Sequence, residues 1–172
     1  MRRPCVLSTF SLSLWKGVFP LHILVSACLL GTPCRYDGAS KPEPIVNKLE
    51  ELGHCLIPVC PEVMGGLPTP RPPAEVQPDG RVVNQAGADV TAAYRSGAEQ
   101  ALEAAKQHGC TMAVLKEKSP SCGGREIYDG SFSRTLIPGQ GIAAQLLTAH
   151  GIRVLGESQL PQLLAELEEQ EK

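Results

Sequence analysis

Three cysteines stand where an apolar segment meets a loop rich in glycine or proline. Cys28 follows ILVSA, Cys60 follows LIPV, and Cys122 precedes two glycines in SPSCGG. In an open α/β sheet the carboxyl ends of neighbouring strands meet at one crevice, where ligands usually bind. The pattern therefore predicts that these three thiols, which we call the cysteine triad, meet in space although they are far apart in the sequence.

Converging thiolates favour a soft metal centre. Cys thiolates hold iron–sulfur clusters, whereas structural zinc requires four tetrahedral ligands. The sequence contains neither Cys-x-x-Cys nor His-x-x-x-His, which disfavours a zinc ribbon or finger. Cys34 is open to three interpretations: a fourth ligand, a thiol beside the substrate, or an inert residue. Cys55 and Cys110 lie at apolar strand starts, which is typical of small core hydrophobes.

Acid–base candidates lie next to the cysteine triad. Glu62 comes two residues after Cys60, and Ser119 and Ser121 come just before Cys122. A carboxylate beside a metal centre can activate water, and a hydroxyl can orient a substrate or relay a proton. Capping of a turn is an equally good explanation of Glu62.

Other polar residues suggest substrate binding more weakly. Arg35, Tyr36, Asp37 and Arg71 could bind a polar substrate, although Arg35 and Asp37 could equally form a local ion pair. The segment 139–141, Gly-Gln-Gly, resembles a phosphate cradle at a helix start. A single Gly-x-Gly is weak evidence, and easing the start of a helix explains it better.

Composition excludes several classes of function. The chain has 172 residues, a formal net charge of −2 and only 4 % aromatic residues. Nucleic-acid binding is therefore not expected, because it needs a basic face or stacking aromatics. The seven cysteines are too sparse for a small secreted disulfide scaffold, which favours reduced thiols or metal ligands. No apolar run reaches the roughly 18 residues of a membrane span.

Hydrophobic patterning predicts an α/β fold. Apolar runs indicate strands at 21–27, 55–59, 111–115 and 152–155, with a short strand at 81–83 at the edge of the sheet. Helices are expected after a Ser40 cap, from an Asp89 cap to His108, over 141–150, and after a Ser158 cap. This alternation predicts a Rossmann-like three-layer sandwich, with a mostly parallel sheet and helices on both faces.

The beginning of the chain has two interpretations. We expect residues 1–20 to be a leader or dispensable extension, and residues 21–172 to form a single domain. The segment Val25-Ser26-Ala27-Cys28 resembles a lipoprotein cleavage box, but Lys16, Pro20 and His22 interrupt the preceding apolar run. A cytoplasmic protein is therefore expected, with an exported lipoprotein lipidated at Cys28 as the alternative.

Four segments in order identify a family. SACLLGTPCRYDG, PVCPEVMGGLPTPRPPAE, LKEKSPSCGGREIYDGSFS and IPGQGIA resemble the thiouracil desulfidase family, a bacterial domain, over about residues 22–157. The N-terminal extension departs from the family pattern, in which the first strand starts almost at the initiator Met.

The resemblance implies a site and a reaction. It implies a 4Fe–4S cluster bound by the cysteine triad with one open iron, and Glu62 and Ser119 as the catalytic pair. The open iron would act as a Lewis acid on the sulfur of a thiolated pyrimidine such as 2-thiouracil. Water activated by Glu62 would attack the adjacent carbon, which releases uracil and sulfide without net redox change. A protein that accepts the sulfide is left open, and a non-catalytic metal- or cluster-binding sensor is the alternative.

Overall fold

A four-stranded parallel sheet forms the centre of the computed structural model, which describes residues 20–170. Its strands run in the order β2 (Cys55–Val59), β1 (His22–Ser26), β5 (Met112–Leu115) and β8 (Arg153–Gly156). All three strand pairings are parallel. The predicted parallel sheet is confirmed, whereas the predicted leader of residues 1–20 lies, except for Pro20, outside the described residues.

Alternating side chains of each strand point to opposite faces of the sheet and build two cores. Ile23 and Val25 of β1 belong to one core, and Leu24 between them belongs to the other. All three side chains are fully buried. The continuous apolar run of β1 therefore reflects a central strand that is covered on both faces, as parallel sheets require.

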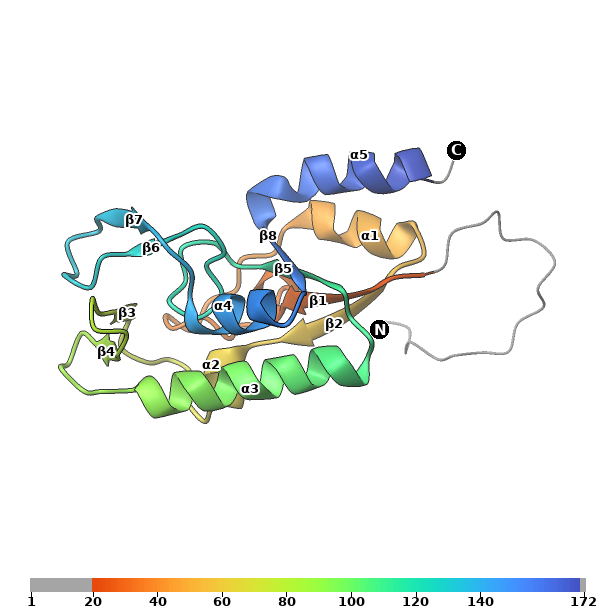
Figure 1. Cartoon of the computed structure of the whole chain (residues 1–172). Helices are drawn as coiled ribbons and strands as arrows, with labels where there is room; N and C mark the ends of the chain where they lie inside the picture. The colour runs from red at the N-terminus through yellow and green to blue at the C-terminus, as the bar shows by residue number, and fades with distance from the viewer. Residues whose placement is uncertain (1–19, 171–172) are drawn as a thin grey trace.

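Helices supply the outer layers of the sandwich (Figure 1). The helices α1 (Asn47–Glu51) and α5 (Leu160–Gln170) cover one face, and α3 (Thr91–Gln107) and α4 (Ile142–Ala149) cover the other. Leu49 and Leu163 pack in the first core, and Leu102 and Leu147 pack in the second. The predicted three-layer α/β sandwich is confirmed.

Two antiparallel hairpins lie beyond the carboxyl ends of the central strands (Figure 1). One pairs β3 (Ala74–Val76) with β4 (Val82–Asn84), and the other pairs β6 (Glu126–Tyr128) with β7 (Leu136–Pro138). The expectation that the strand at 81–83 edges the central sheet was wrong, because β4 pairs with β3 alone among the described strands. The sequence of a strand this short does not indicate which other strand it pairs with.

The predicted helix starts needed correction. Ser40 caps no helix: the chain turns through the 3-10 helix η2 (Pro44–Val46) before α1 begins. Ser158 lies inside the 3-10 helix η3 (Glu157–Gln159) instead of capping α5. The N-cap residue of α3 is Val90, one residue after the expected Asp89. Asp89 still contacts the helix start, since its carboxylate accepts a hydrogen bond of 2.9 Å from the amide of Thr91.

The Val25–Cys28 segment is structural. Val25 and Ser26 end the central strand β1, and Ala27 and Cys28 begin the buried 3-10 helix η1 (Ala27–Leu30). Cleavage before Cys28 would remove the central strand, so this position argues against the lipoprotein alternative. In residues 20–170, none of the helices combines the length and apolar character that crossing a bilayer demands.

Candidate active site

A cavity of about 440 Å³ opens at the carboxyl ends of the central strands. The chain passes from β1 to β2 on one side and reaches β5 on the other, so the sheet order reverses beside β1. This reversal is the point at which open α/β sheets bind their ligands. All three members of the cysteine triad line the cavity, as does Cys34. The structure therefore places the three predicted thiols on the walls of one cavity.

The thiols of the cysteine triad follow three different strands. Cys28 lies in η1, Cys60 lies between β2 and the helix α2 (Pro61–Met64), and Cys122 lies in the loop after β5. Together with Cys34 they are free thiols. Cys60 Sγ lies 3.7 Å from the carbonyl oxygen of Cys34, within reach of a weak hydrogen bond. Cys34 is thus part of the same cluster of thiols.

The protein surroundings keep three of these thiols protonated. A hydrogen bond with Cys28 raises the pKa of Cys34, and a hydrogen bond with Cys34 raises that of Cys60 further. Burial raises the pKa of Cys122 to about 12, opposed by a hydrogen bond with Ser26 and reinforced by the negative charge of Glu62. An added positive charge, such as a metal centre supplies, would lower these pKa values and favour the thiolate forms.

Two serines, Ser26 and Ser121, lie beside Cys122. Ser121 was among the hydroxyl candidates from the sequence, whereas Ser26 was not. Ser26 is buried at the end of β1, and its Oγ accepts a hydrogen bond of 2.9 Å from the amide of Lys116. Ser121 Oγ is buried without a hydrogen-bond partner among the described residues. A buried, unpaired hydroxyl next to a thiol suits a group that accepts hydrogen bonds there. The sequence signal that could have identified Ser26 as a site residue was its polar side chain in an otherwise apolar strand.

No three His, Cys, Asp or Glu side chains within residues 20–170 form a group that could hold a metal ion. An iron–sulfur cluster makes a different demand, because each thiolate binds its own iron at a separate corner. Three soft donors around a cavity fit that demand, whereas they do not fit a compact single-ion site.

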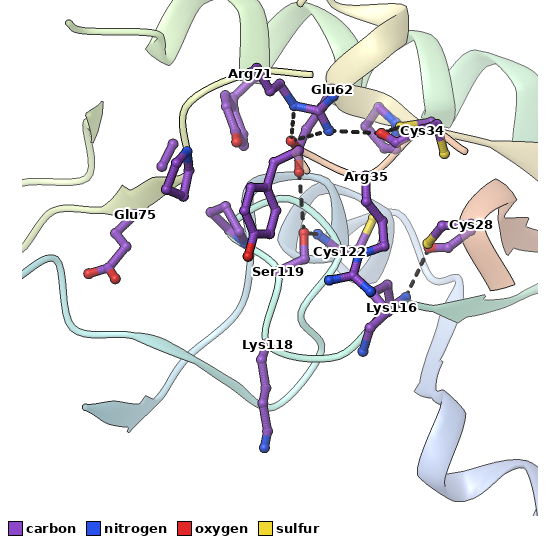
Figure 2. Close-up of a pocket in the computed structure, with 18 of the residues that line it drawn as sticks. Cys28, Cys34, Arg35, Glu62, Arg71, Glu75, Lys116, Lys118, Ser119 and Cys122 are labelled. Atoms are coloured by element: carbon purple, nitrogen blue, oxygen red, sulfur yellow. Dashed lines mark hydrogen bonds and ion pairs between the residues drawn. The ribbon is translucent and has the colours of Figure 1, made fainter. Parts of the chain in front are cut away.

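Glu62 lines the cavity and forms an ion pair with Arg71 (Figure 2). Its Oε2 accepts a hydrogen bond of 2.7 Å from Arg71 Nε, and Arg71 Nη2 lies 2.6 Å from the same oxygen. Its other oxygen, Oε1, lies 3.5 Å from Ser119 Oγ. The two predicted acid–base residues are therefore neighbours. The expectation that Arg71 binds substrate directly finds no support, because its charge is paired with Glu62.

Close helix packing positions Glu62. The short helix α2 that carries it crosses α3 at two glycines, Gly65 and Gly97. A Cβ atom on Gly97 would lie 1.8 Å from the carbonyl oxygen of Pro61, and one on Gly65 would lie 2.0 Å from that of Ala93. Only glycine permits backbones to approach so closely. The glycines therefore set how far Glu62 lies from the sheet.

The Ser119 hydroxyl has a defined orientation. Its oxygen accepts hydrogen bonds from the amides of Ser121 at 3.1 Å and Cys122 at 3.0 Å. A hydroxyl has two acceptor lone pairs and one proton. Because both lone pairs are used, its proton is directed to the cavity side, where Glu62 Oε1 is the acceptor. The same two bonds fold the loop that carries Cys122.

Backbone amides at the amino terminus of α4 bind the loop that carries Cys122. The amide of Ile142 donates to the carbonyl of Pro120 at 2.9 Å, and the amide of Ala143 donates to that of Ser121 at 2.9 Å. A Cβ atom on Gly141 would lie 2.5 Å from the Ser121 carbonyl. The Gly-Gln-Gly segment therefore allows a close approach of backbone, and these helix amides bind the protein's own carbonyls instead of a phosphate.

The outer wall of the cavity is cationic and locally strained. Lys118, Phe132 and Arg134 line it with φ angles of 61°, 58° and 63°. Such left-handed backbone is uncommon outside glycine and clusters at functional sites. Arg35 also lines the wall, and it pairs with Asp37 at 3.1 Å, which is the local ion pair that the sequence left as an alternative.

Buried Glu75 joins the two hairpins that close this wall. Its Oε2 accepts a hydrogen bond of 3.0 Å from the amide of Phe132. The side chain therefore connects β3 to the loop between β6 and β7. Nothing in the local sequence of Glu75 indicated this role, because its partner is 57 residues away.

Comparison with known proteins agrees with this geometry. The model of the 2-thiouracil desulfurase family matches residues 23–159. The chain belongs to that family. Family membership confirms the resemblance drawn from the four motifs. A solved structure of a [4Fe-4S]-dependent thiouracil desulfidase, TudS, has 49 % sequence identity and a TM-score of 0.79, with 86 % of this chain and 98 % of that chain covered.

A curated relative gives the same extent of match. The uncharacterized protein YbbK of Bacillus subtilis (strain 168) is 40 % identical over 151 residues, which cover 83 % of this chain and 99 % of that protein. The 2-thiouracil desulfurase family and the TudS structure point to an enzyme, so the sensor that the sequence kept as an alternative is not favoured.

Proposed function

We propose that this member of the 2-thiouracil desulfurase family is a [4Fe–4S]-dependent desulfidase that replaces the sulfur of a thiolated pyrimidine with oxygen. With 2-thiouracil and water as reactants, the products are uracil and hydrogen sulfide. One observation carries the proposal: a carboxylate, a hydroxyl with a directed proton and three converging thiols share one cavity. The relation to TudS supports it.

The cysteine triad would hold the cluster. The donors suit iron–sulfur ligation, since they are free thiols at the ends of three strands around a cavity. The buried, unpaired Ser121 hydroxyl lies where it could donate to the sulfur of Cys122 or of a cluster. A bound cluster with one open corner supplies a Lewis acid that polarises the thiocarbonyl group.

Glu62 is proposed to act as the general base. Its Oε2 is held by Arg71, so Oε1 is the oxygen available to take a proton from water. The oxygen of that water forms the new bond to the ring carbon as the carbon–sulfur bond breaks, and the protons of the water leave with the sulfide. Carbon keeps its oxidation state, so no electron donor or acceptor is required.

Ser119 is proposed to orient the substrate and relay a proton. Its proton points toward Glu62 Oε1 across 3.5 Å, which is long for a hydroxyl–carboxylate hydrogen bond. A substrate group or a water in the cavity can therefore bridge the two oxygens from the side. The nearby phenol of Tyr94 stays protonated, because burial and then the charge of Glu62 raise its pKa.

Anaerobic turnover tests the proposal. The protein, loaded with iron and sulfide, is given 2-thiouracil, and uracil and sulfide are measured together. Glu62→Gln and Ser119→Ala should each keep the absorption near 400 nm expected of an iron–sulfur protein. Each should lower kcat by about 10²-fold or more, the usual contribution of a general acid or base. No sulfide from fully loaded wild type would refute the reaction, and full activity in Glu62→Gln would remove this residue from it.

A further inference from the structure

Arg71 lines the cavity, and its guanidinium forms hydrogen bonds with four other residues. Its residue is only 9 % exposed. Besides Glu62 it donates from Nη2 to the carbonyl of Cys34 at 3.1 Å, and from Nη1 to the carbonyl of Pro68 and to Thr69 Oγ1, both at 3.2 Å. A guanidinium carries five N–H donors in a rigid fork. With this set of acceptors, no free side of the fork faces a substrate.

The bonds to Glu62 select one carboxylate oxygen. Both Nε and Nη2 approach Oε2, at 2.7 and 2.6 Å, and leave Oε1 toward Ser119 (Figure 2). The carboxylate side chain is 12 % exposed and the arginine side chain 5 % exposed, so water competes little for this pair. Two donors of a rigid fork that converge on one oxygen fix the position of that oxygen and hold the negative charge of the carboxylate there.

The same side chain connects Glu62 to the thiols. The Cys34 carbonyl that accepts from Arg71 also accepts from Cys60 Sγ at 3.7 Å. Arg71 therefore crosslinks the loop after β1, the Pro-rich loop and the helix α2. Movement of the acid–base group relative to the thiols would have to break several of these bonds together.

We propose that Arg71 is the positioning residue of the desulfuration, which presents Glu62 Oε1 at a set distance from the cysteine triad. The inference rests on the proposed function and assigns Arg71 no contact with the substrate. Because a displacement of about 1 Å at a reacting group costs about 10²-fold in rate, loss of the fork should lower kcat and leave KM nearly unchanged.

Three variants of the full chain test the inference, with Arg153→Met as the matched control. Arg153 also holds a glutamate, Glu166, at 2.8 and 3.2 Å, but on the surface away from the cavity. Arg71→Met should lower kcat about 10²-fold. Arg71→Lys, which keeps the charge and loses the fork, should recover only part of this loss. Absorption near 400 nm, measured for each variant, reports cluster loading separately from turnover.

A double variant separates positioning from general structure. If Arg71 acts through Glu62, adding Arg71→Met to Glu62→Gln should not lower the residual rate further. The double variant also removes the buried charge that Arg71→Met alone leaves unpaired, so it should be less destabilised than the single variant. A further large loss in the double variant, a rise of KM in place of a fall of kcat, or an Arg71→Lys enzyme with full activity would overturn the inference. Inactive wild type would instead refute the proposed reaction.

Discussion

Replacing Gly97 by alanine tests whether helix contact, and not only local bonding, positions the proposed general base. The new Cβ atom would lie 1.8 Å from the Pro61 carbonyl oxygen and 2.6 Å from its carbon. These are backbone atoms that cannot rotate away. The helices must separate by about 1.2 Å to reach even the tightest tolerated contact of 3.0 Å. Since Glu62 follows Pro61, the carboxylate moves with the helix.

The expected magnitudes follow from opposing effects. Overpacking costs about 1–3 kcal/mol, and a backbone clash belongs at the upper end of that range. Alanine gains about 1 kcal/mol over glycine from its helix propensity. The net loss of about 2 kcal/mol should lower the melting temperature by about 4–8 °C. Turnover should fall much more, by about 10²-fold, because the displacement is about 1 Å at a reacting group.

Differential scanning calorimetry and sulfide release measure the two effects on the same sample. Ser96→Ala on the exposed side of α3 is the control, and it should leave both melting temperature and turnover nearly unchanged. An unchanged melting temperature in Gly97→Ala would show that the close contact is wrong. A lowered melting temperature with full turnover would show that the contact does not position Glu62.

Two further predictions concern the cysteines and an ion pair behind the site. Alanine at any member of the cysteine triad should abolish the absorption near 400 nm. The control Cys110→Ala should keep this absorption and lose only about 1–3 kcal/mol of stability from packing. Full cluster loading without one of the triad thiols would contradict the assignment. Glu157 accepts hydrogen bonds from Lys116 and from the amide of Glu117, which outweigh burial and lower its pKa. Its contribution is therefore present above the unfolded pKa of about 4.3. Wild type should therefore be more stable than Glu157→Gln by about 1.5–3 kcal/mol at neutral pH. This difference should shrink as the pH falls below the unfolded pKa of Glu157. A free-energy difference that stays constant when unfolding is measured at acid pH would contradict this prediction.

The gathering of the thiols was predictable from the sequence because it follows from strand ends. Apolar runs showed where β1, β2 and β5 stop, and a parallel sheet brings those ends together. The pairing of Glu62 with Ser119 came from the family resemblance, since their spacing of 57 residues carries no periodic signal. The four central strands and the long helix from Asp89 were likewise visible as hydrophobic patterns.

The features that the sequence did not predict lie in loops, whose contacts with distant parts of the chain leave no periodic pattern. Arg71 lies in a Pro-rich segment without periodicity. The sequence therefore could not show that its guanidinium pairs with Glu62 and not with a substrate. The strand at 82–84 was visible, but its pairing with β3 was not, because short strands carry no register signal of their own. The Ser40 cap failed because prolines at 42 and 44 redirect the chain into a 3-10 turn first.

The bonds between the α4 amides and the carbonyls of Pro120 and Ser121 have a consequence for how the enzyme matures. They are made entirely by the polypeptide, so the third thiol is held in place before any inorganic component arrives. Zinc fingers behave differently, since their ligands come together only as the ion binds. If the cysteine triad holds the proposed cluster, the loop that carries Cys122 does not depend on that cluster for its fold. Loss of the cluster to oxygen would then leave this loop able to take up a new one.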